Sequence, residues 1–270
     1  MSARPITFLS DYGYEDEFAG VCRGVISRIA PEAPLIDLTH GVAPGDVRRG
    51  AVMLADALPY SPGGVHLAVV DPGVGTGRRP VAVRVRSEDR VLVGPDNGLL
   101  WPAIEILGGP VELSDLARSP YRLEPLAATF HGRDLFAPVA ARLALGEGLA
   151  AAGEPADSGS LMRLELPAAG VEGDRVIAEV LYLDRFGNAT LSARPADLEG
   201  PPLSPGSRVV VEHGPSSHQA TFARAFGEVG EGDLMLYEDS SRRLALAVNR
   251  GSAAEALGVR PGDEVTLVLA

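Results

Sequence analysis

Acidic residues follow two of the apolar runs that we predict to be β-strands. Asp11 comes soon after the run at residues 6–9, and Asp71 directly follows the run at residues 65–70. In α/β proteins, ligands bind beyond the carboxyl ends of the strands. Carboxylates at these ends can orient a substrate hydroxyl or deprotonate a water molecule. An aspartate at a strand end is also a common turn former or helix cap, so neither residue identifies a site by itself.

Three further segments place polar side chains next to glycine. Residues 94–98 read Gly-Pro-Asp-Asn-Gly, residues 129–134 read Thr-Phe-His-Gly-Arg-Asp, and residues 184–188 read Asp-Arg-Phe-Gly-Asn. Histidine is the side chain best suited to acid–base chemistry near neutral pH, which makes His131 a candidate catalyst. Taken singly, each segment also fits a structural role, such as a hairpin turn at residues 96–98, a packed histidine or a helix cap.

The glycine-rich loop at residues 73–77 does not predict a dinucleotide site. A dinucleotide-binding loop must open a helix, because the helix N-terminus holds the pyrophosphate. Here the loop leads through Arg78 and Arg79 into an apolar run at residues 80–85, which we predict to be a strand. We therefore exclude this class of cofactor site.

The elements that must hold these residues alternate between strand and helix in the first half of the chain. Each predicted strand is a short apolar run, and each predicted helix carries its apolar residues on one stripe. The predicted strands are residues 6–9, 35–38, 65–70, 80–85 and 91–93, and the predicted helices are residues 18–29, 47–58 with Asp46 as its cap, and 134–145. Such alternation is typical of an α/β domain with a mostly parallel central sheet.

The second half of the chain contains short β-rich runs separated by Gly and Pro turns. These runs are residues 176–183, 208–212, 219–222, 233–237, 244–248 and 264–269. The pattern indicates a smaller all-β domain, either a barrel or a sandwich. We therefore predict an α/β domain at residues 1–150, a linker region at residues 151–172 and a β domain at residues 173–270.

The composition excludes several classes of function. All 24 basic residues are arginine and 36 residues are acidic, so the formal net charge is −12. Without lysine, the chain cannot form a Schiff base or supply the P-loop lysine of nucleotide hydrolases, and an acidic protein is not expected to bind nucleic acid. Cys22 is the only cysteine, which excludes a disulfide framework and a cysteine-based zinc site. With no signal-peptide pattern and no long apolar span, we expect a cytoplasmic protein that does not contact membranes.

Taken together and in their order along the chain, the motifs resemble one known family. They are Ser-Asp-Tyr-Gly at residues 10–13, Asp-Pro-Gly-Val-Gly-Thr at 71–76, the segments at 94–98, 129–134 and 184–188, and Val-Asn-Arg-Gly-Ser-Ala-Ala at 248–254. The set is similar to that of the S-adenosylmethionine (SAM) hydrolases, also called SAM hydroxide adenosyltransferases, which are relatives of the SAM-dependent fluorinase and chlorinase. The resemblance covers nearly the whole chain. It implies a two-domain fold and a homotrimer, with each active site between the N-terminal domain of one subunit and the C-terminal domain of its neighbour.

The reaction that the resemblance implies is attack of water or hydroxide on the 5′ carbon of the SAM ribose, which releases L-methionine and forms adenosine without a cofactor or a metal. In this family an Asp, an Arg and a His position the attacking water, and they match Asp71, Arg78 and His131. The aspartate can orient or deprotonate the water, while the other two residues can stabilise hydroxide. The sequence leaves open which residue accepts the proton.

The resemblance also implies a set of substrate-binding residues. Asp11 matches the carboxylate that accepts both ribose hydroxyls, and Phe130 and Phe186 match the walls of the ribose and adenine site. The other positions are Gly132, Asp184 for the methionine ammonium, Asn188 for the adenine edge, and Ser240 and the backbone of Val248 for adenine or the methionine carboxylate. One departure is visible, because many relatives have glutamate where this chain has Ala245, so that a contact there is lost or replaced.

Two alternatives stand beside SAM hydrolysis. One is a chlorinase-like halogenase. The halogenases carry Tyr-Pro-Ala-Thr-Gly-Thr in place of residues 71–76 and Tyr in place of His131, and the fluorinase has Ser in place of Gly132. Asp71 weighs against this alternative, since a carboxylate beside the nucleophile site would repel halide. The other alternative is an adenosine- or SAM-binding protein with little turnover.

Overall fold

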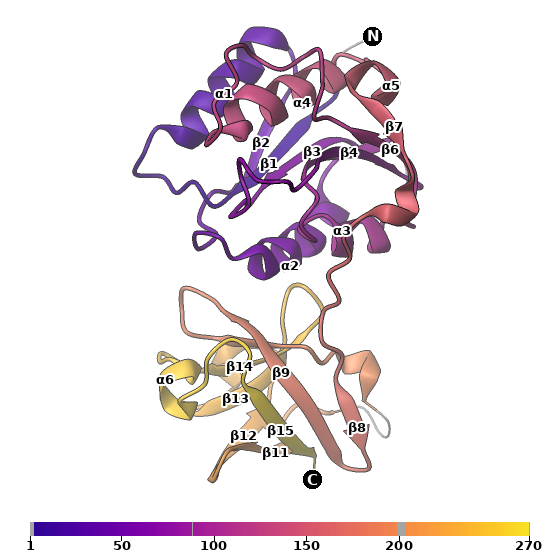
Figure 1. The fold of residues 1–270 in the computed structure, drawn as a ribbon. Helices are drawn as coiled ribbons and strands as arrows, with labels where there is room; N and C mark the ends of the chain where they lie inside the picture. The colour runs from indigo at the N-terminus through magenta and orange to yellow at the C-terminus, as the bar shows by residue number, and fades with distance from the viewer. Residues whose placement is uncertain (1–2, 88, 199–202, 270) are drawn as a thin grey trace. The chain divides into compact units, whose positions relative to one another are not determined.

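The structure, a computed structural model, describes residues 3–87, 89–198 and 203–269 of the chain. It divides into two compact units, Met1–Glu165 and Leu166–Ala270, which we call the N-terminal unit and the C-terminal unit. Each unit is described by itself (Figure 1). Within the described ranges, no helix combines the length and the apolar character that crossing a membrane requires.

In the described residues, the N-terminal unit forms a seven-stranded sheet in the order β2-β1-β3-β5-β4-β6-β7. The strands are β1 (Ile6–Ser10), β2 (Leu35–Thr39), β3 (Gly64–Val69), β4 (Pro80–Val85), β5 (Arg90–Pro95), β6 (Pro110–Asp115) and β7 (Glu154–Ala156). β2, β1, β3 and β5 pair in parallel, whereas β4, β6 and β7 add in antiparallel fashion. Because Ser10 pairs with Val69 at the carboxyl ends of β1 and β3, the segments that begin at Asp11 and Val70 leave the sheet at one edge.

Helices cover both faces of this sheet (Figure 1). They are α1 (Phe18–Ile29), α2 (Val47–Ala57), α3 (Trp101–Ile106), α4 (Ala137–Ala144) and α5 (Leu149–Ala152). Phe8 of β1 packs with residues of α1 and α4, while its neighbour Leu9 packs with residues of α2 and α3. Successive side chains of a strand point to opposite faces, so one strand contributes to both apolar cores. Trp101 opens α3, and the Arg163 guanidinium lies 4.9 Å from the centroid of its ring.

Local sequence signals account for two of the helix ends. α1 ends at Ile29 because the next residue, Ala30, precedes Pro31 and is disfavoured in the helical conformation. α2 is capped as predicted, since the side chain of Asp46 accepts a hydrogen bond from the backbone N–H of Arg49 at 2.9 Å.

Two segments differ from the sequence expectations. The helix expected at residues 134–145 begins earlier, with a π-helical turn at Gly132–Phe136, and continues as α4. The hairpin interpretation of residues 96–98 is wrong, because the chain continues from β5 into α3. Tertiary contacts decide this course, since the Asp96 carboxylate accepts hydrogen bonds from the Arg79 guanidinium and from the backbone N–H of Met162 at 2.8 Å.

The C-terminal unit is a closed β-barrel. Its strands are β8 (Gly170–Glu172), β9 (Arg175–Leu183), β10 (Ala189–Leu191), β11 (Arg208–His213), β12 (Ser216–Phe222), β13 (Leu234–Glu238), β14 (Leu244–Val248) and β15 (Glu264–Leu269). The strand order is β10-β14-β13-β12-β11-β15-β9-β8, and pairing of β10 with β9 closes the ring. α6 (Ala253–Leu257) follows β14, and its first turn is capped by the Ser252 hydroxyl. The predicted fold class, an α/β domain with a smaller all-β domain, is confirmed.

The region that we predicted as a linker, residues 151–172, contains regular structure. β7 belongs to the sheet of the N-terminal unit, where it pairs with β6. β8 pairs with β9 of the barrel. The division between the two units falls between these strands, after Glu165.

Candidate active site

The N-terminal unit brings Asp71, Arg78 and His131 into direct contact. Asp71 lies just beyond β3, Arg78 just before β4, and His131 immediately before the π-helical turn. Nε of Arg78 donates to Oδ1 of Asp71 at 2.8 Å, and Nη2 of Arg78 pairs with Oδ2 of the same carboxylate. Nη2 also lies 3.0 Å from Nδ1 of His131. The side chains of Asp71 and Arg78 are only 6% and 9% exposed, so this bidentate pair is shielded from solvent.

A glycine allows the loop at residues 71–78 to approach the segment that carries His131. Gly75 has φ +75°, which is in the left-handed region that L side chains rarely adopt. A Cβ at this position would lie 2.6 Å from the carbonyl oxygen of Ala128. The sequence therefore needs glycine there for the loop to pack beside residues 127–131.

The hydrogen bond from Arg78 fixes the protonation of His131. Burial and the neighbouring guanidinium of Arg78 both lower the pKa of His131 below its ordinary value, although the charge of Asp71 acts in the opposite sense. Guanidinium only donates, so Nδ1 of His131 is the acceptor, and the proton of the neutral ring resides on Nε2. His131 thus offers an N–H donor to whatever lies beyond it.

Asp11 is held beside this set by the loop that follows β2. Its Oδ2 accepts a hydrogen bond from the backbone N–H of Gly45 at 2.8 Å. Burial raises the pKa of Asp11 and the negative charge of Asp71 raises it further, while the Gly45 N–H opposes the shift. The backbone N–H of Asp11 also donates to the carbonyl oxygen of Val69, two residues before Asp71, at 3.3 Å, so Asp11 is held next to the segment that carries Asp71.

Tyr12 is a member of this cluster that the sequence analysis did not single out. Its ring makes edge contacts with Phe130 and Phe8, with centroids 5.7 Å and 6.4 Å apart. A Cβ added at Gly132 would lie 1.9 Å from the Tyr12 hydroxyl oxygen, so the phenol occupies the space that a side chain at position 132 would need. Burial raises the pKa of Tyr12, which keeps the phenol neutral. Its place next to Asp11 in the Ser-Asp-Tyr-Gly motif was the available sequence signal.

The C-terminal unit contains an open pocket of about 630 Å³ that gathers most of the remaining predicted residues. Its lining includes Asp184, Phe186, Asn188 and Val248 from the prediction, together with Phe226, Tyr237, Asn249, Arg250 and Gly251. The rings of Phe226 and Tyr237 lie 5.6 Å apart. Phe186 is 66% exposed, and the Arg185 guanidinium carbon lies 5.1 Å from the centroid of its ring, so the remaining exposed ring surface can pack on a flat apolar ligand. Aromatic walls with amide and carboxylate groups at the edge suit a heteroaromatic base.

Asp184 shapes the turn on which this pocket depends. Its Oδ1 accepts backbone hydrogen bonds from Phe186 at 2.8 Å and Asn188 at 3.0 Å, and its Oδ2 accepts from Nδ2 of Asn188 at 2.8 Å. This is the turn-forming role that the sequence also allowed, and it orients the two predicted ligand contacts. Asn188 is 6% exposed, and its amide is held by the Asp184 carboxylate.

Two positions of interest lie outside the pocket lining. Ser240 is an exposed residue in the turn between β13 and β14, and it does not line the 630 Å³ pocket. Ala245 is fully buried in β14, where it pairs with Tyr237 on one side and Thr190 on the other. Position 245 therefore places a methyl group between Tyr237 and Thr190 of the neighbouring strands, with no polar side-chain atom there.

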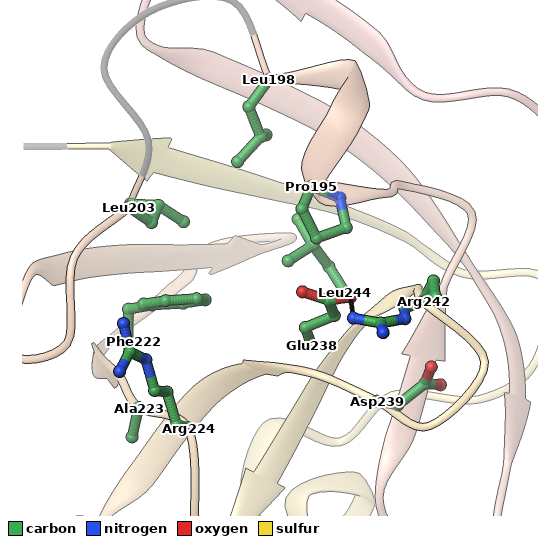
Figure 2. A pocket seen from close by; sticks show the side chains of 10 residues that line it. All are labelled: Pro195, Leu198, Leu203, Phe222, Ala223, Arg224, Glu238, Asp239, Arg242 and Leu244. Carbon is green, nitrogen blue, oxygen red and sulfur yellow. Dashed lines mark hydrogen bonds and ion pairs between the residues drawn. The ribbon is translucent and has the colours of Figure 1, made fainter.

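A second cavity of about 510 Å³ in the same unit contains none of the predicted residues (Figure 2). Apolar side chains, among them Leu198, Leu203 and Phe222, form much of its lining. On one side, Arg242 donates to Glu238 at 2.8 Å. In the described part of the chain, no group of three or more His, Cys, Asp or Glu side chains is arranged to hold a metal ion.

Comparison with known proteins places this geometry in a family. The model of the SAM hydroxide adenosyltransferase N-terminal domain matches residues 6–153, and that of the C-terminal domain matches residues 178–266. An (R)-S-adenosyl-L-methionine hydrolase of Salinispora tropica is 49% identical over 96% of both chains, and one of Thermus thermophilus is 45% identical over 98% of this chain and 100% of its own. A fluorinase of Actinopolyspora mzabensis is 29% identical over 97% of both chains. The crystal structure of an uncharacterized conserved protein from Thermotoga maritima has a TM-score of 0.89 at 38% identity and covers 97% of this chain and 99% of its own. The chain therefore belongs to the SAM hydroxide adenosyltransferase family.

Proposed function

We propose that this protein hydrolyses SAM to adenosine and L-methionine by attack of water or hydroxide on ribose C5′. The observation that carries the proposal is the contact set Asp71–Arg78–His131, with Arg78 bonded to both partners. The names of the relatives that are 45–49% identical support the same reaction. Fluorinases match at lower identity, which agrees with a shared SAM chemistry and a different nucleophile.

The set supplies both a proton acceptor and two donors. Arg78 can only donate, and neutral His131 presents its Nε2–H, so we assign Asp71 as the acceptor of the water proton. The oxygen forms its bond to C5′ while the C5′–sulfur bond breaks, and the electron pair stays on sulfur as the neutral thioether of methionine. Because sulfonium is already a good leaving group, no acid has to assist its departure. Placement and partial desolvation of the nucleophile then lower the barrier.

We assign the remaining predicted residues to substrate binding. Asp11 accepts the ribose hydroxyls, since its carboxylate keeps acceptor capacity beside the single Gly45 N–H bond. Phe130 borders the ribose, and the pocket with Phe186, Asn188 and Val248 takes the adenine. In this proposal Gly132 remains a backbone neighbour of the substrate, Asp184 faces the methionine ammonium, and Ser240 faces adenine or the methionine carboxylate.

We further propose that the working form is a homotrimer in which the N-terminal unit of one subunit and the C-terminal unit of its neighbour complete each active site. The ribose and water groups lie in one unit, and the aromatic pocket lies in the other. Native mass spectrometry gives the number of chains. Co-expression of Asp71→Asn with Asn188→Asp, assayed at a SAM concentration below KM, tests shared sites, because mixed oligomers regain activity only when intact halves from different chains can combine. Mixed oligomers without activity would exclude shared sites.

Turnover decides between the functions. Purified protein is incubated with SAM at near-neutral pH, and the products are separated by chromatography. Adenosine and methionine in equal amounts support hydrolysis, and lack of turnover with retained adenosine supports a binding protein. The same assay with added chloride tests the halogenase alternative, because only a halogenase forms a chlorinated adenosine. Asp71→Asn should remove most of the turnover while it leaves SAM affinity largely intact.

A further inference from the structure

A buried chain of polar groups runs from the residue before Asp11 to the protein surface. Oγ of Ser10 lies 2.7 Å from Nδ1 of His40, and Nε2 of His40 lies 3.3 Å from Oδ1 of Asp37. The other carboxylate oxygen of Asp37 lies 3.0 Å from the Arg23 guanidinium. Ser10 and His40 are 0% and 1% exposed, so neither can meet a substrate directly.

The direction of the protons in this chain follows from its ends. The negative charge of Asp37, 3.3 Å from Nε2 of His40, favours the tautomer of the neutral ring that carries its proton on Nε2 and leaves Nδ1 as the acceptor. The Ser10 hydroxyl therefore donates to Nδ1, and its oxygen accepts the backbone N–H of Tyr12 at 3.3 Å. Burial lowers the pKa of His40 although Asp37 opposes the shift, which agrees with a neutral ring.

The backbone of His40 holds the same loop from the other side. The N–H of Gly13 donates to the carbonyl oxygen of His40 at 2.8 Å, and the N–H of His40 donates to the Tyr14 hydroxyl at 3.0 Å. The His40 ring also makes edge contacts with Phe8 and Tyr14, at centroid distances of 4.6 Å and 5.5 Å. Contacts to His40 thus lie both before and after Asp11 in the chain.

We propose that His40, through Ser10, is a positioning residue that holds the Asp11 carboxylate in the orientation that accepts the ribose hydroxyls. Asp11 has one side-chain tether of its own, the Gly45 N–H, and Gly45 lies in the loop that begins at His40. That loop therefore contacts the Asp11 turn at several points, and the bond between Nδ1 of His40 and the Ser10 hydroxyl is a buried side-chain link that one substitution can remove. The inference rests on the proposed function, because it assumes that Asp11 binds the ribose.

The same strand offers a matched control. Thr7 of β1 also pairs its hydroxyl with a buried histidine, since its Oγ1 lies 2.9 Å from Nδ1 of His66. Thr7 and His66 are 1% and 0% exposed, as buried as Ser10 and His40. This pair lies toward the amino end of β1, away from Asp11 along the strand. Thr7→Val and Ser10→Ala therefore each delete a buried hydroxyl bonded to a histidine, and only the latter adjoins Asp11.

The test measures adenosine Kd by calorimetry together with kcat and KM for SAM. We expect Ser10→Ala to raise the Kd and KM about tenfold while kcat changes by less than about threefold, because the ribose contact acts in both ground and transition states. Thr7→Val should leave all three values within about twofold of wild type. In the double variant Ser10→Ala/Asp11→Asn, Kd should match that of Asp11→Asn alone, since the hydroxyl acts through Asp11.

A second pair of variants, at His40, tests the same inference if Ser10→Ala fails to fold. His40→Asn keeps an acceptor near the place of Nδ1, and His40→Phe keeps a ring against Phe8 without any acceptor. The affinity for adenosine should fall in the order wild type, His40→Asn, His40→Phe. Additive effects of Ser10→Ala and Asp11→Asn on the adenosine Kd would overturn the inference, and so would equal losses of affinity in Ser10→Ala and Thr7→Val. Either result would leave the proposed function untouched. If Asp11→Asn binds adenosine as well as wild type does, the ribose assignment in the proposed function fails and the inference fails with it.

Discussion

Arg78 donates to His131 and to Asp71 at once, with Nη2 3.0 Å from Nδ1 of His131 and Nε 2.8 Å from Oδ1 of Asp71. One planar guanidinium therefore sets the orientation of an acceptor and of a donor. It also sets the tautomer of His131, because only an unprotonated Nδ1 can accept from it. The guanidinium carbon of Arg78 also lies 5.2 Å from the centroid of the Phe136 ring, the last residue of the π-helical turn, in a cation–π contact.

Replacing Arg78 by lysine should separate charge from geometry. Lysine keeps the positive charge but has no planar fork, so it cannot bond to both Asp71 oxygens and to His131 together. We expect kcat to fall about 100-fold or more, with a much smaller change in SAM affinity. Steady-state kinetics and adenosine calorimetry check this, and a lysine variant with wild-type kcat would contradict the orienting role.

The hydrogen bond from Arg78 to Nδ1 of His131 predicts a pH profile. Protonation of His131 places a hydrogen on Nδ1 and a second positive charge beside Arg78, so the contact set breaks in acid. Because burial and Arg78 lower the pKa of His131 below 6.5, activity should be constant near neutral pH and decline only at lower pH. The measurement is kcat/KM from about pH 4 to about pH 9. Activity that falls as the pH rises through the histidine range would mean that the protonated ring is the active form.

The contact between Tyr12 and Gly132 predicts a steric effect. Gly132→Ala puts a methyl group 1.9 Å from the Tyr12 hydroxyl, and the ring is confined by Phe8 and Phe130. We expect a loss of about 1–3 kcal/mol in the free energy of unfolding, together with lower turnover. In Tyr12→Phe/Gly132→Ala the nearest ring atom is Cζ at 2.9 Å, so recovery should be partial.

Gly24→Ala is the control for this substitution. Gly24 lies in α1, and a Cβ added there would meet no atom within 4 Å, so a methyl group should stabilise the helix by up to about 1 kcal/mol. Urea denaturation of the four proteins gives the comparison. Equal stability of Gly132→Ala and wild type would show that the Tyr12 ring moves freely.

Much of the fold could be predicted because it is encoded locally. α1 has the predicted bounds, Phe18–Ile29, since an apolar stripe defines its face and Pro31 ends it. β4, β14 and β15 also coincide with their predicted runs. β10 could not be found in this way, because it is only three residues long and exists through its pairing with β9 and β14.

Residues of the candidate site could be predicted where motifs contain them, and could not be predicted where only packing brings them together. Asp71, Arg78 and His131 were found through the resemblance of their motifs, and the structure brings them into contact. Phe226 and Tyr237 lie on separate elements, and their place in the pocket wall follows from the course of the barrel strands. The spacing of Phe226 and Tyr237 in the sequence therefore does not predict that their rings lie side by side.

Introducing a charge at Asn188 should disable the pocket of the C-terminal unit. Nδ2 of Asn188 donates to Oδ2 of Asp184 at 2.8 Å, so Asn188→Asp replaces a hydrogen bond by repulsion between two adjacent carboxylates. We expect adenosine affinity to fall about tenfold or more, and to recover partly toward pH 4 as one carboxyl takes up a proton. Asn188→Ala removes the hydrogen bond without adding a charge. Its affinity for adenosine should fall less than that of Asn188→Asp and should not recover in acid. Identical losses in the two variants would argue against the electrostatic cause.

Trp101, the single tryptophan of the chain, opens α3 in the N-terminal unit and lies beside Arg163. Tryptophan fluorescence therefore reports only on the N-terminal unit, because the barrel contains no tryptophan. Circular dichroism, in contrast, sums over both units. Denaturation curves recorded by the two methods should coincide if the two units unfold cooperatively. Trp101 is thus a natural probe that distinguishes one unfolding transition from two.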